Sequence, residues 1–243
     1  MLTVSETFYS LQGEGPTAGT PAVFLRLKGC NLTCGGLNTV KTKQLDNGAT
    51  WRCDTTEVWL KGQDMTYDEI KQEWQKNGAW DALKIHAHLV ITGGEPLLHQ
   101  EALILFLDWL QNQLGICPYI EIETNGTVMP KEAFDAYVSQ YNVSPKLKNS
   151  GMPLERRFNP SVIAWCNTSE KAIFKFVVEN EADVKEALAD FSPNTERLFL
   201  MPAADNREAY LKVSPVVADL CKRYQCYFSS RLQVVLWNKT TGV

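Results

Sequence analysis

Three of the seven cysteines of this chain lie in one polar segment, "GCNLTCGGLNTVKTKQLDNGATWRCDT", at residues 29–55. Three residues separate Cys30 from Cys34, and 18 residues separate Cys34 from Cys53. Iron–sulfur clusters of the cuboidal type usually have four cysteine ligands. With three, one iron is left open for a substrate or cofactor, so the spacing predicts a 4Fe-4S cluster that takes part in chemistry.

Other interpretations of these cysteines stay open at this point. Buried core cysteines fit poorly, because the neighbouring residues are mostly polar or glycine. Structural zinc normally needs four ligands; His86 and His88 offer a fourth, although such a pair on a strand is usually polar surface. A redox dithiol favours two intervening residues rather than three.

The cysteine segment directly follows one of several expected strands. Apolar runs rich in β-branched residues predict strands at 22–27, 89–92, 119–123, 173–178 and 198–201, and a shorter one just before Ser144. Caps and amphipathic spacing predict helices at about 66–77, 101–114, 130–141, 181–191 and 214–224.

Strands that alternate with helices indicate βαβ units and a parallel sheet. A complete eight-fold barrel usually needs about 250 residues, and only about six strand–helix units fit into this chain. We therefore predict an α/β fold, either an incomplete (β/α)6-type barrel or an open sheet, with chemistry at the carboxyl ends of the strands. No linker or repeat is visible, so we expect a single domain over residues 1–243.

Composition and charge exclude several classes of protein. The chain is 44% hydrophobic and 21% charged, as in an ordinary globular protein. The net charge of -4 gives no reason to expect direct binding of nucleic acid. No apolar run approaches the ~20 residues that span a bilayer, and the first residues lack the pattern of a signal peptide. We expect a cytoplasmic protein, in which clustered cysteines more often bind metal than form disulfides.

Six short motifs narrow the interpretation further. They are "LQGEG" at 11–15, "RLKGCNLTC" at 26–34, "CDT" at 53–55, "TGGEPLL" at 92–98, "ETNG" at 123–126 and "SPK" at 144–146. Their order resembles that of the 7-carboxy-7-deazaguanine synthase family of radical S-adenosylmethionine (SAM) enzymes. The members of this superfamily typically have two residues between the second and third cysteines, so residues 35–52 constitute an insertion. Closing the longer loop costs roughly 1–2 kcal/mol, which metal ligation on the order of 10 kcal/mol readily offsets.

The resemblance implies a lyase that converts 6-carboxy-5,6,7,8-tetrahydropterin to 7-carboxy-7-deazaguanine with loss of ammonia, in the biosynthesis of queuosine or other 7-deazapurines. It implies that Cys30, Cys34 and Cys53 hold the 4Fe-4S cluster, whose open iron binds SAM, and that Thr55 helps to hold a Mg2+ ion. It further implies a homodimer and a reduced flavodoxin- or ferredoxin-type electron donor.

The resemblance also assigns the ligand contacts. Arg26 is the cation expected to pair with the carboxylate of the pterin, because a guanidinium binds a carboxylate bidentately. The remaining substrate contacts are Leu11, Gln12, Gly13, Glu14 and Thr92. The expected SAM contacts are Arg52, Asp54, Gly93, Gly94, Glu95, Glu123, Ser144, Pro145, Lys146 and Met201, the last in place of the glutamine that is frequent in the family.

Two other functions remain as alternatives. One is a different radical SAM enzyme, such as an activase that installs a glycyl radical on a partner protein; it shares the cysteines but has no need of Arg26 and "LQGEG". The other is a non-catalytic zinc or regulatory module on the same scaffold. In some relatives the chain end approaches the substrate, which draws notice to the Val243 carboxylate, although we do not count it among the site residues.

Overall fold

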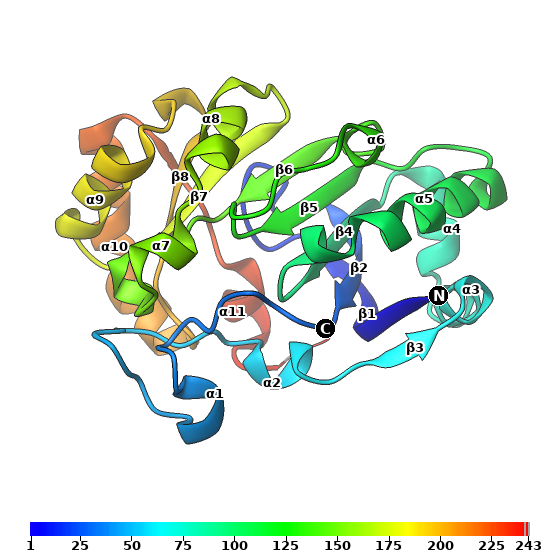
Figure 1. Ribbon diagram of the computed structural model, residues 1–243, viewed down its shortest axis with the longest axis horizontal. Coiled ribbons are helices and arrows are strands. Elements are labelled where there is room, and N and C mark those ends of the chain that lie inside the picture. The colour runs from blue at the N-terminus through cyan, green and yellow to red at the C-terminus, as the bar shows by residue number, and fades with distance from the viewer. Residues whose placement is uncertain (241, 243) are drawn as a thin grey trace.

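The structure is a computed structural model that describes residues 1–240 and 242. In this part of the chain, nine strands form one sheet in the order β3-β1-β2-β4-β5-β6-β7-β8-β9 (Figure 1). From β2 to β9 every neighbouring pair is parallel. The predicted α/β fold with a mostly parallel sheet is therefore confirmed.

The strands expected from the sequence are all present. They are β2 (Pro21–Leu27), β4 (His88–Gly93), β5 (Ile120–Thr124), β6 (Gln140–Val143), β7 (Ala172–Val178) and β8 (Leu198–Pro202). The short β9 (Tyr227–Phe228) was not predicted. Most of their residues are buried. Burial on both faces of a parallel sheet produces the near-continuous apolar runs that made these strands predictable.

The sequence analysis did not identify the first and third strands. β1 (Leu2–Leu11) pairs antiparallel with β2, and β3 (Gln63–Met65) pairs antiparallel with β1. In β1 only Leu2 and Val4 are buried, and the other residues are half-buried or exposed. Because β1 contains polar residues such as Glu6, it does not form the apolar run by which the other strands were predicted.

Three predicted helices are confirmed. α3 (Tyr67–Lys76) begins with a capping box in which Thr66 and Glu69 bond reciprocally. α5 (Gln100–Leu114) ends at Gly115, whose φ of 72° is a left-handed conformation that favours glycine. α9 (Glu181–Phe191) starts at the cap Asn180.

Two predicted helices have the wrong bounds. Instead of a helix over 130–141, only α6 (Glu132–Asp135) is helical, because Gln140–Val143 pairs between β5 and β7 as β6. The last long helix, α10 (Arg207–Tyr224), begins well before Ser214 at the cap Asn206, and Pro215 lies inside it.

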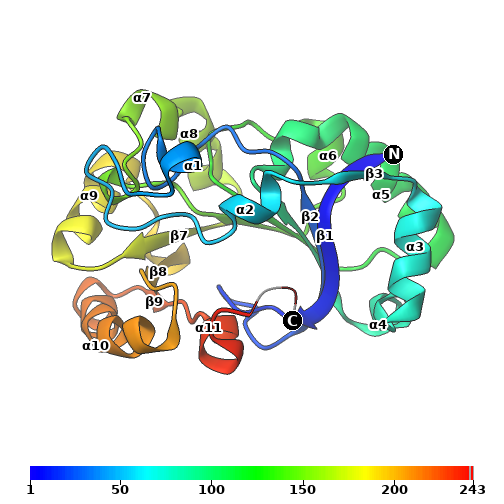
Figure 2. The same cartoon turned by 90° about the horizontal axis from the view of Figure 1, so that it is seen from below.

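Nine shorter helical segments connect these elements. They are α1 (Thr39–Thr42), α2 (Thr56–Trp59), α4 (Ala79–Ile85), η1 (Pro96–His99), η2 (Lys148–Ser150), α7 (Leu154–Arg157), α8 (Pro160–Thr168), η3 (Thr195–Arg197) and α11 (Leu232–Trp237), all within the described residues. Figure 2 shows the sheet bent into an arc with helices outside it, and α11 near the opening between its two ends.

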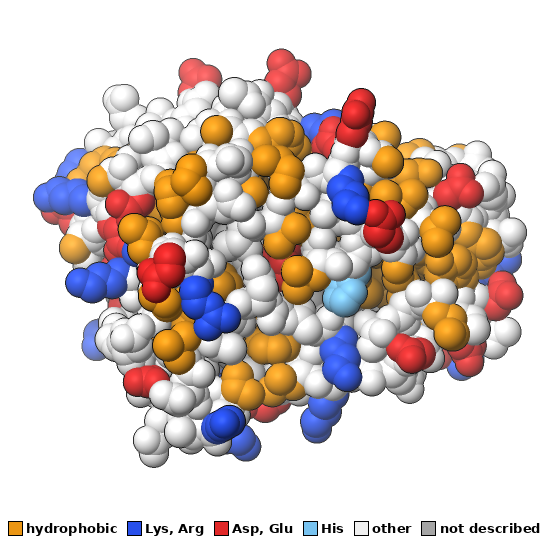
Figure 3. Space-filling model, in the orientation of Figure 1, with side chains coloured by type: hydrophobic (Ala, Val, Ile, Leu, Met, Phe, Trp, Pro, Cys, Tyr) orange, Lys and Arg blue, Asp and Glu red, His pale blue; other side chains and the backbone are white. Residues whose placement is uncertain are grey.

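The surface carries no dominant charge on the face shown in Figure 3, where acidic and basic side chains are interspersed with hydrophobic ones. No helix in the described part of the chain combines the length and apolar composition that crossing a membrane requires.

Candidate active site

A cavity of about 930 Å³ lies at the carboxyl ends of the parallel strands. Its lining includes Gly93 at the end of β4, Thr124 at the end of β5, Ser144 after β6, Val177 near the end of β7 and Met201 in β8. This is the edge of a parallel sheet at which ligands bind.

The cavity brings together the predicted site residues, although they are scattered over the chain. All of them line it except Glu95 and Pro145; those that do are Leu11, Gln12, Gly13, Glu14, Arg26, Cys30, Cys34, Arg52, Cys53, Asp54, Thr55, Thr92, Gly93, Gly94, Glu123, Ser144, Lys146 and Met201. Val243 lies outside the described residues.

The three cysteines occupy one wall of the cavity. Cys34 is buried with Leu32 and Met152, and Cys30 and Cys53 pack against this group. The Cys53 N–H donates to the Cys34 carbonyl at 3.1 Å, so the backbone itself returns the third cysteine to the first two.

The insertion between the second and third cysteines is folded against η2. Gly35 N–H donates to Ser150 O at 2.8 Å, and Thr50 N–H donates to Asn149 O at 2.9 Å. Gly36 has a φ of 113°, and a Cβ at this position would come within 2.5 Å of the Asp46 side chain. The insertion therefore follows a defined path, and its close turn requires glycine.

The surroundings of Cys30 and Cys34 keep both thiols protonated at neutral pH. Burial, with a smaller effect of the neighbouring thiols, raises the pKa of Cys30 to about 11 and that of Cys34 to about 12. Binding to iron would therefore release protons. No group of three His, Cys, Asp or Glu side chains among the described residues is arranged to hold a metal ion. In a cuboidal cluster each thiolate binds a different iron, so the sulfur atoms need not approach as closely as around one zinc.

His86 and His88, considered as zinc ligands, lie outside the cavity that the three cysteines line. His88 Nδ1 instead lies 2.6 Å from Glu121 Oε1.

The turn after β4 packs directly on the cysteine segment. Glu95 N–H donates to Gly29 O at 2.9 Å. A Cβ on Gly94 would come within 2.1 Å of Gly29 O and 2.4 Å of Cys30 Cβ. Only glycine allows this approach, so the "TGGEP" turn and the first cysteine are held at a fixed separation.

The Glu95 carboxylate is part of this scaffold. It is fully buried and accepts hydrogen bonds from Thr124 Oγ1, Asn125 N–H and Leu97 N–H. Burial raises its pKa to about 6, although these donors act in the opposite direction. The carboxylate thus joins β4 to β5 and stabilises the turn.

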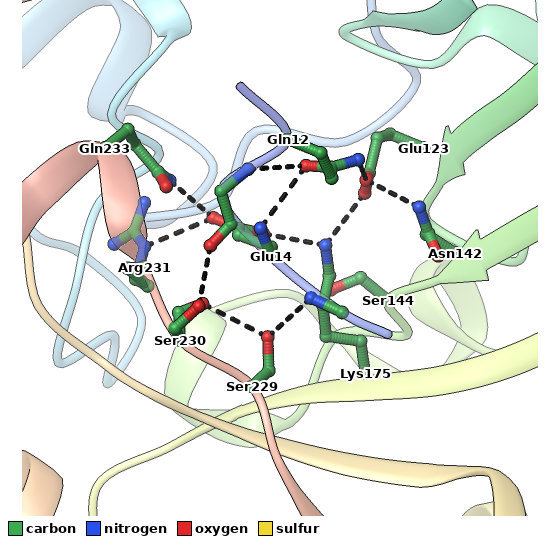
Figure 4. A network of polar contacts seen from close by, with 12 residues as sticks. Gln12, Glu14, Glu123, Asn142, Ser144, Lys175, Ser229, Ser230, Arg231 and Gln233 are labelled. Atoms are coloured by element: carbon green, nitrogen blue, oxygen red, sulfur yellow. Dashed lines mark hydrogen bonds and ion pairs between the residues drawn. The ribbon is translucent and has the colours of Figure 1, made fainter. Parts of the chain in front are cut away.

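A buried lysine joins two other predicted residues. Lys175 Nζ on β7 lies 2.7 Å from Glu14 Oε2 and 2.9 Å from Glu123 Oε2 (Figure 4). Burial alone would raise the pKa of Glu14, but Lys175 and Arg231 outweigh it and hold that pKa at about 2. Burial, together with the neighbouring Glu14, raises the pKa of Glu123. Lys175 was missed, although a lysine inside the apolar run "IFKFVV" is a detectable signal.

Gln12 shapes the turn that carries Glu14. Its Oε1 accepts from the N–H groups of Gly13 and Glu14 at 2.9 and 3.3 Å. Its Nε2 donates to Glu121 at 3.0 Å. These bonds fix the "QGEG" turn, and Gln12, Gly13 and Glu14 all line the cavity.

Other predicted residues also have protein partners. Arg26 Nε lies 2.8 Å from Glu6 Oε1, and Lys146 Nζ lies 3.0 Å from Ser144 Oγ. Thr55 Oγ1 is 3.4 Å from Cys53 Sγ. Arg52 pairs with Glu57 at 2.7 Å.

The C-terminal segment supplies residues that the sequence analysis missed. Arg231 contacts Glu14 and Asp54, and Gln233 Nε2 donates to Glu14 Oε1 at 2.7 Å. Gln233 Oε1 and Ser10 Oγ are buried and have no hydrogen-bond partner among the described residues. Both residues line the cavity, so a polar ligand there would satisfy them.

Comparison with known proteins places the chain among named relatives. A search of protein-family models gave no match. A 7-carboxy-7-deazaguanine synthase from Pyrobaculum aerophilum is 34% identical over 98% of this chain and 96% of the relative. The enzyme of the same name from Halobacterium salinarum is 31% identical over 98% of this chain and 91% of the relative.

The chain belongs to the 7-carboxy-7-deazaguanine synthase family. The crystal structure of QueE from Escherichia coli supports the fold, with a TM-score of 0.58 and 24% identity over 94% of this chain and 92% of that one.

The pKa of Glu14 leads to a prediction about acid stability. Because its folded pKa of about 2 lies below the ordinary 4.5, its contribution is fully present above pH 4.5 and is lost as the pH falls toward 2. The shift corresponds to about 3 kcal/mol. We expect Glu14→Gln to make the free energy of unfolding of the metal-free protein less steep below pH 4.5, as measured by urea denaturation at a series of pH values.

The matched control is Glu155→Gln, which changes an exposed carboxylate that forms no ion pair with another described residue. It should keep the wild-type slope. An unchanged slope in Glu14→Gln would show that Lys175 and Arg231 do not hold this carboxylate ionised.

Proposed function

We propose that this protein is a radical SAM lyase that converts 6-carboxy-5,6,7,8-tetrahydropterin to 7-carboxy-7-deazaguanine with loss of ammonia. The product would enter the biosynthesis of queuosine or another 7-deazapurine. The observation that carries the proposal is the convergence, in one cavity of a member of this family, of Cys30, Cys34 and Cys53 with Arg26 and the "QGEG" turn.

Cys30, Cys34 and Cys53 would hold a 4Fe-4S cluster. When bound, this cluster and SAM together supply the radical that abstracts a hydrogen atom from the substrate. The chain's own task is to bind, orient and exclude water. The wall formed by Leu32, Cys34 and Met152 provides an apolar surrounding for the cluster.

SAM would lie between the "TGGEP" turn and the ends of β5, β6 and β8. The backbone of Gly93 and Gly94 offers carbonyl acceptors for its ammonium group, and Ser144 and Lys146 offer a hydroxyl and an amine for its carboxylate or ribose. Glu95 would act through the turn, because its carboxylate is already bound by three donors. Glu123, Met201, Arg52 and Asp54 are further contacts in this proposal, and Pro145 would shape the backbone beside them.

The pterin would lie between Arg26 and the "QGEG" turn. Glu6 uses Nε of Arg26, which leaves the two terminal nitrogens of the guanidinium for the substrate carboxylate. At the other end, Glu14 is ionised, and its Oε2, which accepts only from Lys175, keeps a lone pair for an N–H group of the pterin. The backbone of Leu11 offers a further partner, whereas Gly13, whose backbone groups are bonded within the protein, would shape the turn. Thr92 lies beside Arg26, its register partner on β2.

The finer features of the family belong to the same proposal. The strands β2, β4, β5, β6, β7 and β8 follow one another in chain order and in parallel, which supports an incomplete (β/α)6 barrel in a single domain. We further propose Mg2+ at Thr55, a homodimer, a flavodoxin- or ferredoxin-type donor and a place in the cytoplasm, where thiols stay reduced.

Anaerobic turnover tests the function. The protein reconstituted with iron and sulfide should form 7-carboxy-7-deazaguanine from SAM, a reductant and the carboxypterin. Alanine at Cys30, Cys34 or Cys53 should abolish both the product and the brown absorption near ~400 nm. Cys117→Ala, which removes an exposed free thiol, is the matched control. A reconstituted wild-type protein that cleaves SAM but leaves the pterin unchanged would refute this substrate.

Arg26 provides a more specific prediction. Arg26→Lys retains the charge but loses the bidentate contact, so kcat/KM for the carboxypterin should fall about 10- to 100-fold. Steady-state kinetics measure this. Arg223→Lys, at a surface ion pair with Glu181, should behave as wild type; equal kinetics for Arg26→Lys would contradict the assignment.

The magnesium assignment has its own measurement. Mg2+ usually takes few protein ligands and completes its octahedron with water and substrate. Thr55→Ala should therefore raise the Mg2+ concentration for half-maximal turnover about 10-fold, in titrations that start from metal-depleted buffer. Thr168→Ala on α8 is the control. Turnover of the wild type that does not respond to added Mg2+ would remove this role.

A further inference from the structure

One arginine from the C-terminal segment contacts three separate parts of the active site. Arg231 Nε lies 3.3 Å from Glu14 Oε1, and one terminal nitrogen lies 2.6 Å from Asp54 Oδ2. The other terminal nitrogen donates to the Ala204 carbonyl after β8. A single guanidinium thus joins the "QGEG" turn, the end of β8 and the residue that directly follows Cys53.

The cysteine segment needs a contact of this kind near Cys53, because a long insertion precedes this third cysteine. Residues 35–52 separate Cys53 from Cys34, and a longer loop fixes its ends at a greater entropic cost. Upstream of Cys53, the insertion is tied to η2 by Thr50 and Trp51, which both bond to Asn149. Downstream, Asp54 is the first side chain able to tie the loop to another part of the fold.

The two carboxylates that Arg231 joins, Glu14 and Asp54, differ in how exposed their side chains are. The side chains of Arg231 and Glu14 are 12% and 17% exposed, whereas that of Asp54 is 47% exposed. Glu14 is also held by Lys175 and Gln233, so this side is rigid. Asp54 is the exposed partner, and through it Arg231 adds a side-chain tie directly after Cys53, beside the backbone bond from Cys53 N–H to the Cys34 carbonyl.

We propose that Arg231 is a positioning residue that ties the Cys53 end of the cluster loop to the substrate-binding turn, so that cluster retention and pterin binding are coupled. This inference rests on the proposed function, because it assigns the cluster to Cys53 and the pterin to Glu14. Coupling of this kind is reciprocal: a pterin bound beside Glu14 would restrict the Arg231 side chain that also holds Asp54, and should therefore slow cluster loss.

The metal-free protein gives the first readout. Lys41 and Lys43 lie exposed in the insertion, so a lysine-specific protease reports how often this loop opens. Arg231→Gln and Asp54→Asn should be cleaved there about 3- to 10-fold faster than wild type, since each loses the ion pair. Arg231→Lys should be intermediate, because one ammonium cannot replace the three-way fork. Arg223→Gln, which removes an arginine ion pair on the surface of α10, should match wild type.

The reconstituted protein gives the second readout. After anaerobic mixing with excess EDTA, the absorbance near ~400 nm should decay about 3- to 10-fold faster in Asp54→Asn and Arg231→Gln. Added carboxypterin should slow the decay in wild type and in Arg223→Gln, but should slow it much less in Asp54→Asn. Asp54→Asn keeps the arginine and its buried partners, so it remains informative even if Arg231→Gln fails to fold.

The outcomes separate this inference from the proposed function. If wild type forms product while Asp54→Asn matches it in proteolysis, iron loss and protection by pterin, the coupling is refuted and the function stands. If wild type neither forms a cluster nor is protected by the pterin, the proposed function itself fails. The proposal is supported if Asp54→Asn and Arg231→Gln are cleaved faster in the loop and the pterin no longer slows their iron loss, while Arg223→Gln behaves as wild type. This result would establish that Arg231 couples the cluster loop to the substrate-binding turn.

Discussion

The polar side of the cavity, formed by the "QGEG" turn and Glu123, depends on the pairing of the buried Lys175 ammonium group with two carboxylates. Lys175 pairs with Glu14, which lies in the loop after β1, and with Glu123, which lies on β5. A charge removed from water is costly unless it is paired and hydrogen-bonded. The three groups therefore cannot separate without a large penalty, and this fixes the "QGEG" turn relative to the central strands. Gln12 of the same turn reaches Glu121 on β5, although the two are 109 positions apart in the chain.

A second constraint is steric and acts on the side of the cavity that carries the cysteines. Gly94 approaches Gly29 and Cys30 so closely that no side chain fits between them, and Glu95 fastens the same turn to β5. The polar side of the cavity and the side that carries the cysteines are thus held in place by different interactions. Charge pairing places the groups that would recognise a polar ring, whereas close backbone packing places the groups that would hold iron.

The sequence allowed much of this arrangement to be predicted, for identifiable reasons. The central strands are buried on both faces and therefore read as apolar runs, and the cysteines and glycines stand in short motifs with restrictive chemistry. The helix expected over 130–141 was wrong because strand pairing of Gln140–Val143 overrode a local helical signal. Lys175 is detectable as a charge inside an apolar run, but its pairing with Glu14 could not be predicted, nor could that of Arg231 with Asp54. These pairs are 161 and 177 positions apart, and only the folded chain brings them together. Glu95 stays a predicted SAM contact; that its buried carboxylate binds backbone and side-chain donors of the protein could not be predicted, because two of these donors lie on and after β5.

Residues 229–238, which follow the short strand β9, complete one side of the cavity. Ser230 Oγ and Leu232 N–H both bond to the Gly13 carbonyl, and Gln233 bonds to Glu14. A protein that had lost these residues would retain its central strands and its three cysteines, but its cavity would be open on this side. Proteolytic removal of this segment would therefore disturb the "QGEG" turn without removing any of the three cysteines.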